Sequence, residues 1–192
     1  MSSRKPQSTA ARIVKFHDVQ DPKYGMLSPL SPHPVVIRHH QYPSLHHYFL
    51  CERFKDFPVE QRIQRATTTW ELDRLVKEAE ANGYQRTEWN RIKLDVMLLG
   101  TYFKFKQNEE PRKVLLSTEQ CVLVDHTIKD DFWGDNGNGT GKNLMGVTLM
   151  VVRDRLRREE SHHSTVDTVK ESTKKSGVRV LRDVMSSRQP AR

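Results

Sequence analysis

Two consecutive helical patterns in residues 68–108 limit most strongly the folds that are open to this chain. Thr68 is followed three residues later by Glu71, which is the form of a helix-capping box, and apolar residues then recur at helical spacing as far as Asn82. A second apolar stripe follows at steps of three and four residues: Trp89, Ile92, Val96, Leu99 and Phe103. The sequence therefore predicts two helices in succession, the second ending near residue 108.

Strand patterns lie on both sides of this helical stretch. Residues 12–16 alternate apolar and polar, residues 34–37 form a second short strand pattern, and residues 121–124 are a continuous apolar run of strand length. Further helices are predicted from residue 43 and after Asn143, the last with Met145, Leu149, Val152 and Leu156 along one face. This order favours a single α+β domain that is mainly helical and has a small sheet.

Charge and hydropathy differ between the ends of the chain and its middle. The 192 residues fit one domain, yet only 35% of them are apolar, which is low for a fully packed chain. Lys and Arg exceed Asp and Glu by eight, and most of this excess lies in residues 1–11 and 161–192. We therefore expect a folded domain over 12–160, a disordered basic arm before it and a mostly disordered basic tail after it. Basic tails of this kind indicate at most a weak attraction to nucleic acid. A protein that acts through interactions of these tails is one possible function.

Several other classes of protein are disfavoured. The longest aliphatic run, residues 96–99, is far shorter than the roughly 18 residues that a membrane span needs, and no apolar signal segment follows the first residues. We expect an intracellular, cytoplasmic protein without a membrane partner. Cys51 and Cys121 show no metal-site spacing, and the histidines form no HExxH pair. The sequence therefore predicts neither a metal site nor a cofactor.

The segment 130–143 is the strongest candidate for a ligand site. It holds four glycines within eight residues and runs into the last predicted helix. Glycines allow backbone N–H groups to approach a ligand, and a helix start adds unpaired donors, so a phosphate or ribose could bind there. The spacing is that of neither a Walker A loop, which needs glycine at 136, nor a Rossmann loop, which needs glycine at 142. Asp130 lies close to Trp133 in the sequence, which places an acid next to a flat stacking surface and favours a ligand site. The competing interpretation of the segment is a flexible connection that is capped by Asn143.

Motifs spread over residues 16–158 together resemble the NADAR domain family. They are the run Tyr42–Phe49 with Phe54, then Trp89 and Lys93, Leu116–Thr118, Leu123–Asp125, the block Asp130, Phe132, Trp133 and Gly134, and finally Gly139, Gly141, Asn143, Gly146, Leu149, Met150 and Arg153. The resemblance implies an α+β fold and hydrolysis of an N-glycosidic bond to ribose. Substrates of the family are phosphorylated ribosylamine intermediates of riboflavin synthesis, or bases modified with ADP-ribose.

The resemblance also implies roles for particular side chains. An oxocarbenium-like transition state needs a nearby carboxylate and a base that orients water, which makes Asp130, His46 and Asp125 the expected catalytic residues. The expected partners of the base, ribose and phosphate are Ser28, His47, Tyr48, Trp89, Lys93, Trp133, Gly134, Gly139, Gly141, Lys142 and Asn143. Packing alone is the competing interpretation for Trp89, and simple exposure is the competing interpretation for Lys93. Nucleic acid is expected as a partner only when it carries ADP-ribose, or weakly through the basic tails.

Three positions depart from the family pattern. Most members have Glu where this chain has His46, and most have G-x-F-S-N-F where this chain has residues 25–30. The acid of the usual L-V-E triplet is Asp125, one methylene shorter. These differences leave two functions to compare: an N-glycosidase with an altered pocket, and a catalytically weakened module that binds ADP-ribose or a related nucleotide.

Overall fold

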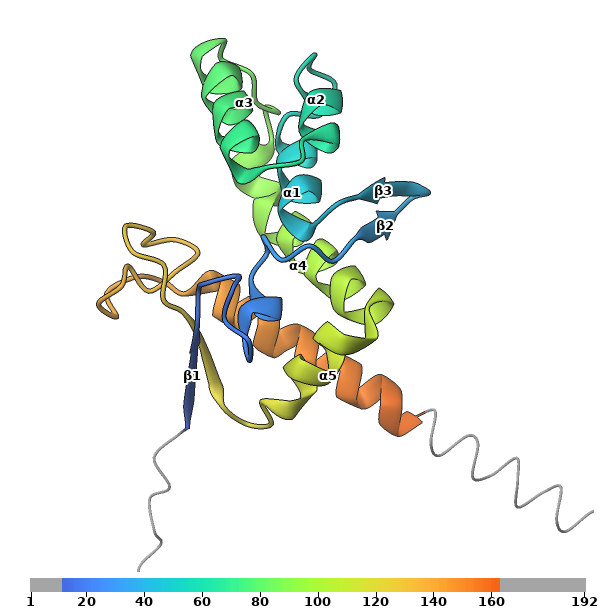
Figure 1. The fold of residues 1–192 in the computed structure, drawn as a ribbon, viewed down its shortest axis with the longest axis vertical. Helices are drawn as coiled ribbons and strands as arrows, with labels where there is room; N and C mark the ends of the chain where they lie inside the picture. Colours follow the sequence, from blue (N-terminus) through green and yellow to red (C-terminus); the bar gives the residue numbers. More distant parts are fainter. Residues whose placement is uncertain (1–11, 163–192) are drawn as a thin grey trace, which may run out of the picture. The chain divides into compact units, whose positions relative to one another are not determined.

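The structure is a computed structural model that describes residues 12–162. The chain divides into two compact units, Met1–Arg153 and Asp154–Arg192, and all the labelled elements of Figure 1 belong to the first. The predicted disordered segments were 1–11 and, for the most part, 161–192; residues 161 and 162 continue the last helix, and the rest of both segments lies outside the described residues. Within the described part, no helix is both long enough and apolar enough to cross a membrane.

Helices dominate the fold, as expected for an α+β domain with a small sheet. The elements in chain order are β1 (Ile13–Phe16), the 3-10 helix η1 (Gly25–Leu27), β2 (Val35–Ile37), β3 (His40–Tyr42), α1 (Leu45–Arg53), α2 (Glu60–Arg65), α3 (Thr69–Ala81), α4 (Trp89–Gln107), α5 (Glu109–Ser117) and β4 (Val122–Asp125). A final helix begins at residue 144 and continues to residue 162, where the description ends. Residues 12–153 thus form one α+β unit with two short, two-stranded sheets.

The two sheets bring distant parts of the sequence together. β1 pairs with β4 in parallel, and their register sets Phe16 opposite Asp125. β2 and β3 form an antiparallel hairpin that is closed by Arg38 and His39. Both turn residues have positive φ angles, 51° and 68°, in the left-handed region that glycine and asparagine occupy most readily.

The predicted cap of α3 is confirmed, because the Thr68 hydroxyl accepts the Glu71 N–H at 3.1 Å. The predicted stripe on α4 is partly wrong, since Leu99 is 38% exposed. The face that is buried instead includes Gly100 and Lys104, two residue types that a hydrophobic pattern does not count. A Cβ at position 100 would lie 2.5 Å from the Leu45 side chain, so glycine is what allows α4 to cross α1 so closely.

Four short elements were not predicted: η1, α2, α5 and β3. Pro111 obscures α5 in the sequence, although proline is tolerated within the first helical turn, where its missing N–H has no intrahelical partner. The last helix is confirmed, and its predicted apolar face is buried: Met145, Leu149, Val152 and Leu156. At Gly146 this helix meets β4, because a Cβ there would lie 2.1 Å from the Leu123 carbonyl oxygen.

Candidate functional site

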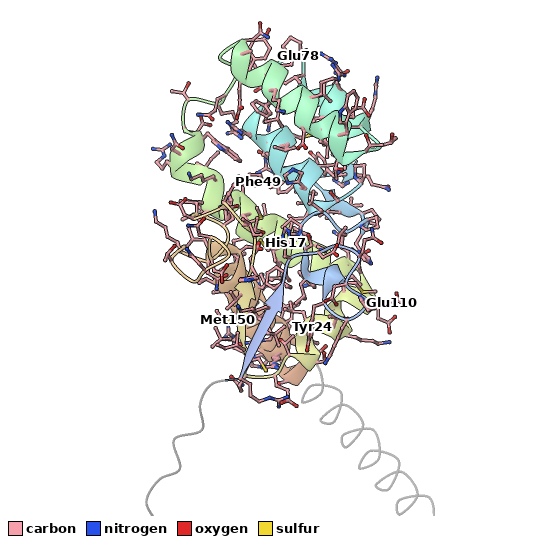
Figure 2. All side chains as sticks on the ribbon, turned by 60° about the vertical axis from the view of Figure 1, so that its left-hand side comes forward. His17, Tyr24, Phe49, Glu78, Glu110 and Met150 are labelled. Atoms are coloured by element: carbon pink, nitrogen blue, oxygen red, sulfur yellow. The ribbon has the colours of Figure 1, made fainter. Side chains whose placement is uncertain are left out.

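A cavity of about 200 Å³ lies where β1, β4 and the start of α1 come together, and we call it the catalytic cavity. Figure 2 labels two of its residues, His17 after β1 and Phe49 on α1. Its lining consists of Phe16, His17, Ser28, Pro29, Leu30, His46, Phe49, Met97, Asp125, Thr127, Asp130, Trp133 and Met145. The structure therefore brings together the predicted catalytic residues Asp125, Asp130 and His46 with the predicted contacts Ser28 and Trp133.

Asp125 ends β4 and is buried, with 7% of its surface exposed. Its backbone N–H donates to Asn143 Oδ1 at 2.9 Å, and its carboxylate accepts the Thr127 hydroxyl at 2.5 Å. Burial raises the pKa of Asp125 above its ordinary value; the Thr127 hydrogen bond opposes this, and the negative charge of Asp130 adds to it. Asp125 therefore keeps its proton to a higher pH than an exposed aspartate does.

Asp130 has a different environment from Asp125. Its Oδ1 accepts two backbone N–H groups, from Phe132 at 3.0 Å and from Trp133 at 2.8 Å. Its Oδ2 has no hydrogen-bond partner among residues 12–162. The same turn fixes the Trp133 indole, which meets the edge of Phe49 with ring centres 5.4 Å apart. One carboxylate oxygen is thus used to hold the loop, and the other remains available to a ligand.

His46 lies in the first turn of α1, where its backbone N–H donates to the Pro29 carbonyl at 3.0 Å. Its ring lines the catalytic cavity, and neither ring nitrogen bonds to another group in the described part of the chain. Burial, with a smaller effect of His47, lowers the pKa of His46 to about 4. The imidazole is therefore neutral at pH 7 and can accept a proton.

Three predicted contacts lie in the interior rather than on the wall of the catalytic cavity. His47 bonds Ser44 Oγ at 2.7 Å and the Ala66 carbonyl at 3.1 Å, so both of its ring nitrogens are occupied. Tyr48 is 3% exposed. Trp89 packs against Phe49 with ring centres 4.8 Å apart. In this conformation these side chains hold α1 in place, and their contact with ribose or base stays a prediction.

The glycine-rich loop uses its N–H groups internally. Gly139 and Gly141 donate to the Asp135 carbonyl, and Asn143 donates to that of Gly134. A Cβ at Gly141 would lie 2.3 Å from the Gly134 oxygen, so glycine is required there by packing. The amides that were expected to hold phosphate are therefore occupied in this conformation, and their binding role stays a prediction. Asn143 instead supports Asp125 through its side chain.

Two predicted lysines converge beside the catalytic cavity. Lys93 Nζ of α4 lies 3.9 Å from the centre of the Phe132 ring, and Lys142 Nζ lies 5.3 Å from it. The two cations come from segments almost fifty residues apart in the sequence. Both form cation–π contacts with Phe132, the aromatic neighbour of Trp133, and their contact with a ligand phosphate stays a prediction.

Comparison with known proteins decides the family. The model of the NADAR domain matches residues 15–157. This chain belongs to the NADAR family. N-glycosidase YbiA of Shigella flexneri is 33% identical over 148 residues, which are 77% of this chain and 91% of that protein. A riboflavin biosynthesis protein of Vibrio vulnificus is 32% identical over 143 residues, which are 74% of this chain and 38% of that protein.

The solved structures give the same result for this NADAR chain. The NMR structure of Escherichia coli YbiA superposes with a TM-score of 0.69 at 31% identity, covering 78% of this chain and 88% of that one. The family and the fold that the resemblance implied are confirmed. The named relatives support an enzyme of the N-glycosidase type.

Sequence reasoning missed two residues that shape this cavity: His17, which lines it, and Lys104, which holds one of its walls. His17 lines the cavity, and its Nδ1 lies 2.9 Å from Thr127 Oγ1, whose hydroxyl in turn bonds Asp125. Lys104 is fully buried and donates to the Met26 carbonyl, the Ser28 carbonyl and the Ser31 hydroxyl. A lysine on the inner face of α4 could have indicated that Lys104 binds buried carbonyl groups. Nothing local in the sequence indicates that His17 pairs with Thr127.

Proposed function

We propose that this protein hydrolyses a carbon–nitrogen bond between ribose and a base or amine in the catalytic cavity. The observation that carries the proposal is the convergence of Asp125, Asp130 and His46 on one cavity beside Trp133. The names of the relatives support this reaction class. The substrate class we favour is a phosphorylated ribosylamine of riboflavin synthesis or a base modified with ADP-ribose.

The geometry supports a division of roles. When the C–N bond breaks, the leaving nitrogen takes a proton, and Asp125 is suited to give it because burial raises its pKa. Positive charge develops on the ribose, and the free Oδ2 of Asp130 is suited to stabilise it. Water then bonds to the ribose carbon and loses a proton, which the neutral ring of His46 can accept.

The surroundings support a substrate with an aromatic base and a phosphate. The Trp133 ring offers a stacking surface at the cavity, and Lys93 and Lys142 supply positive charge next to it. Ser28 lines the cavity from the loop after η1, and its hydroxyl accepts the Leu30 N–H at 3.3 Å. This arrangement favours a small phosphorylated riboside over a neutral nucleoside, and nucleic acid would enter only through an attached ADP-ribose.

One observation favours the second candidate, a module that binds ADP-ribose without turnover. His46 stands where the family usually has Glu, and a neutral imidazole lacks the negative charge that attracts an oxocarbenium ion. If Asp130 supplies that charge, the chain is a hydrolase with narrowed activity. If Asp130 does not supply that charge, the protein binds its ligand but releases no product.

Chromatography of a panel of ribosides and ADP-ribosylated substrates after incubation with the protein tests the proposal. We expect a base or amine to be released, and we expect Asp130→Asn to lower the rate by about a hundredfold or more. The matched control is Asp131→Asn, because Asp131 is exposed and does not line the cavity. Binding of ADP-ribose without any product, in the parent and in both variants, would assign the binding module instead.

A further inference from the structure

A second cavity lies between the β2–β3 hairpin, α1 and α2, with a volume of about 280 Å³. We call it the hairpin cavity. Figure 1 shows the hairpin to the right of α1 and the loop 126–143 to its left. Its lining shares no residue with that of the catalytic cavity: Ile37, Arg38, His40, Tyr42, Glu52, Lys55, Glu60, Gln61 and Gln64. The hairpin cavity is thus a separate candidate site.

Two cationic side chains of the hairpin cavity have no partner among the described residues. Glu52 is paired with Arg86 at 2.9 Å, and Glu60 accepts the Asp56 backbone N–H at 2.8 Å. Arg38 and Lys55, by contrast, have no ion pair or hydrogen bond within residues 12–162. Glu52 is therefore paired with a cation, whereas Glu60 keeps its negative charge and has one oxygen held by a backbone N–H. The guanidinium of Arg38 and the ammonium group of Lys55 remain available to an anion.

Tyr42 adds a hydrogen-bond donor to the wall of the hairpin cavity. Its side chain is more than nine-tenths buried, with 8% of the residue exposed, yet its hydroxyl has no hydrogen-bond partner in the described part of the chain. Burial raises the pKa of Tyr42 to about 12, so the hydroxyl keeps its proton at neutral pH and can donate it. The hydroxyl oxygen is not among the enclosed polar atoms without a partner, so it opens onto the cavity that Tyr42 lines, where a ligand can accept its proton.

The hairpin turn holds Arg38 beside this hydroxyl in spite of an unfavourable backbone. A two-residue turn with both φ angles positive is normally built from Asn-Gly or Asp-Gly, because bulkier residues resist the left-handed conformation. This chain has Arg38 and His39 there, and His40 follows in the lining. The turn thus places a guanidinium and an imidazole at a position where small residues would close the hairpin more easily.

We propose that the hairpin cavity binds the phosphate group of a small phosphorylated metabolite, separately from the catalytic cavity. Arg38 provides the planar pair of donors that suits a phosphate, Lys55 adds charge, and Tyr42 donates from the buried side. A cavity of about 280 Å³ holds one phosphate with a small organic part. The site therefore suits a sugar phosphate.

Titration followed by amide NMR signals tests this proposal, with inorganic phosphate and ribose 5-phosphate as the two probes. We expect inorganic phosphate to give saturable shifts at residues 38–42 without shifts at Trp133, and ribose 5-phosphate to bind the hairpin cavity more tightly. Arg38→Asn should weaken binding about tenfold or more, because it removes a charged donor. Asparagine also tolerates positive φ, so this variant keeps the turn. Glu60→Gln should strengthen binding, since it removes a negative charge from the lining.

The matched control is Arg65→Asn, which removes an exposed arginine that lies outside the lining. Equal weakening by Arg65→Asn and Arg38→Asn would overturn the proposal, as would shifts confined to Trp133 or an absence of saturation. Equal affinity for the two probes would overturn the assignment to a metabolite. Tyr42→Phe should weaken binding without changing the hydrolase rate. These measurements need no turnover, so they stand or fall independently of the proposed hydrolase activity.

Discussion

At the scale of single residues, Asp125 and Asp130 show how one cavity gives two carboxylates different properties. Asp125 is buried and accepts a hydroxyl, whereas Asp130 is only partly buried and accepts two backbone N–H groups. Burial raises the pKa of Asp125, so its ionised form is unfavourable in the folded protein. A buried carboxylate of this kind costs stability at neutral pH, as groups in functional sites often do.

Asp125→Asn is expected to stabilise the protein at pH 7 and to lower the hydrolase rate by about a hundredfold. The amide keeps an acceptor for Thr127 but carries no charge. Because the pKa of Asp125 is raised on folding, the native state holds the proton more tightly, and the cost of ionisation disappears as the pH falls toward the ordinary aspartate range. Urea midpoints at pH 7 and pH 5 should therefore show the gap between variant and parent narrowing at the lower pH. A gap that widens would contradict this environment for Asp125.

His46 gives the opposite pH dependence of stability. Its pKa is about 4 in the folded protein, against about 6.5 for an exposed histidine. As the pH falls from 6.5 toward 4, the unfolded state takes up a proton that the native state does not, so stability declines. His46→Gln lacks this titration and should lose less stability across the same interval. Thermal midpoints at pH 7, 5.5 and 4.5 measure the difference, and identical curves for the two proteins would refute the burial of a neutral imidazole.

His46 also determines the expected substrate range. His46→Glu introduces the carboxylate that the family resemblance implies at this position, and we expect it to raise turnover of family-typical phosphorylated ribosides. The reason is that a carboxylate both attracts the developing positive charge and accepts a proton, whereas histidine only accepts a proton. Initial rates of the parent and the variant on the same riboside provide the comparison. If His46→Glu leaves the rate unchanged while Asp130→Asn also has no effect, the catalytic assignment fails.

At the scale of elements, Lys104 connects α4 to the loop that forms one wall of the catalytic cavity. Its ammonium group donates to the carbonyls of Met26 and Ser28 at 2.8 and 2.7 Å and to the Ser31 hydroxyl at 2.6 Å. Ser28 and the two residues that follow it, Pro29 and Leu30, line the cavity. The position of that wall thus depends on one buried side chain from a distant helix.

Lys104→Met is expected to destabilise the protein by about 2 kcal/mol at pH 7, because it leaves buried acceptors without donors. Burial lowers the pKa of Lys104 to about 7, so between pH 7 and 10 the native state gives up a proton that the unfolded state keeps. The stability that Lys104 confers therefore increases with pH across that range. Urea unfolding should show that the free energy of unfolding of the variant falls further below that of the parent at pH 9 than at pH 7. Lys77→Met, at an exposed position on α3, is the control and should change little.

The sequence is informative where the local pattern coincides with the burial. The Thr68 cap and the apolar face of the last helix were predictable because each depends on residues within one or two turns. Leu99 and Gly100 were misjudged because the closest approach of two helices favours a small residue, which carries no hydrophobic signal. His17 was missed for another reason, since its partner Thr127 is 110 residues away. Long-range register, rather than composition, assembles this part of the site.

At the scale of the whole molecule, the strand pairs and both cavities are formed by residues 13–145. We expect a chain shortened to end at residue 162 to keep the urea midpoint and the hydrolase rate of the full chain. The removed segment is basic in net charge, so the shortened chain should also bind more weakly to heparin. Unfolding of the shortened chain would show that the tail is part of the folded domain.

The parallel pairing of β1 with β4 has a consequence for how the protein is made. β1 is among the first described segments to leave the ribosome, yet its partner strand is synthesised more than a hundred residues later. The cavity closes only after Met145 has emerged, so a nascent chain carries His46 through the next 78 residues before Asp125, the first of the two aspartates in the cavity, is added. Cutting the chain at the exposed turn around Gly83 would separate His46 from Asp125 and Asp130 on two fragments. Activity would then report the reunion of those fragments, which is the property required of a split-protein sensor.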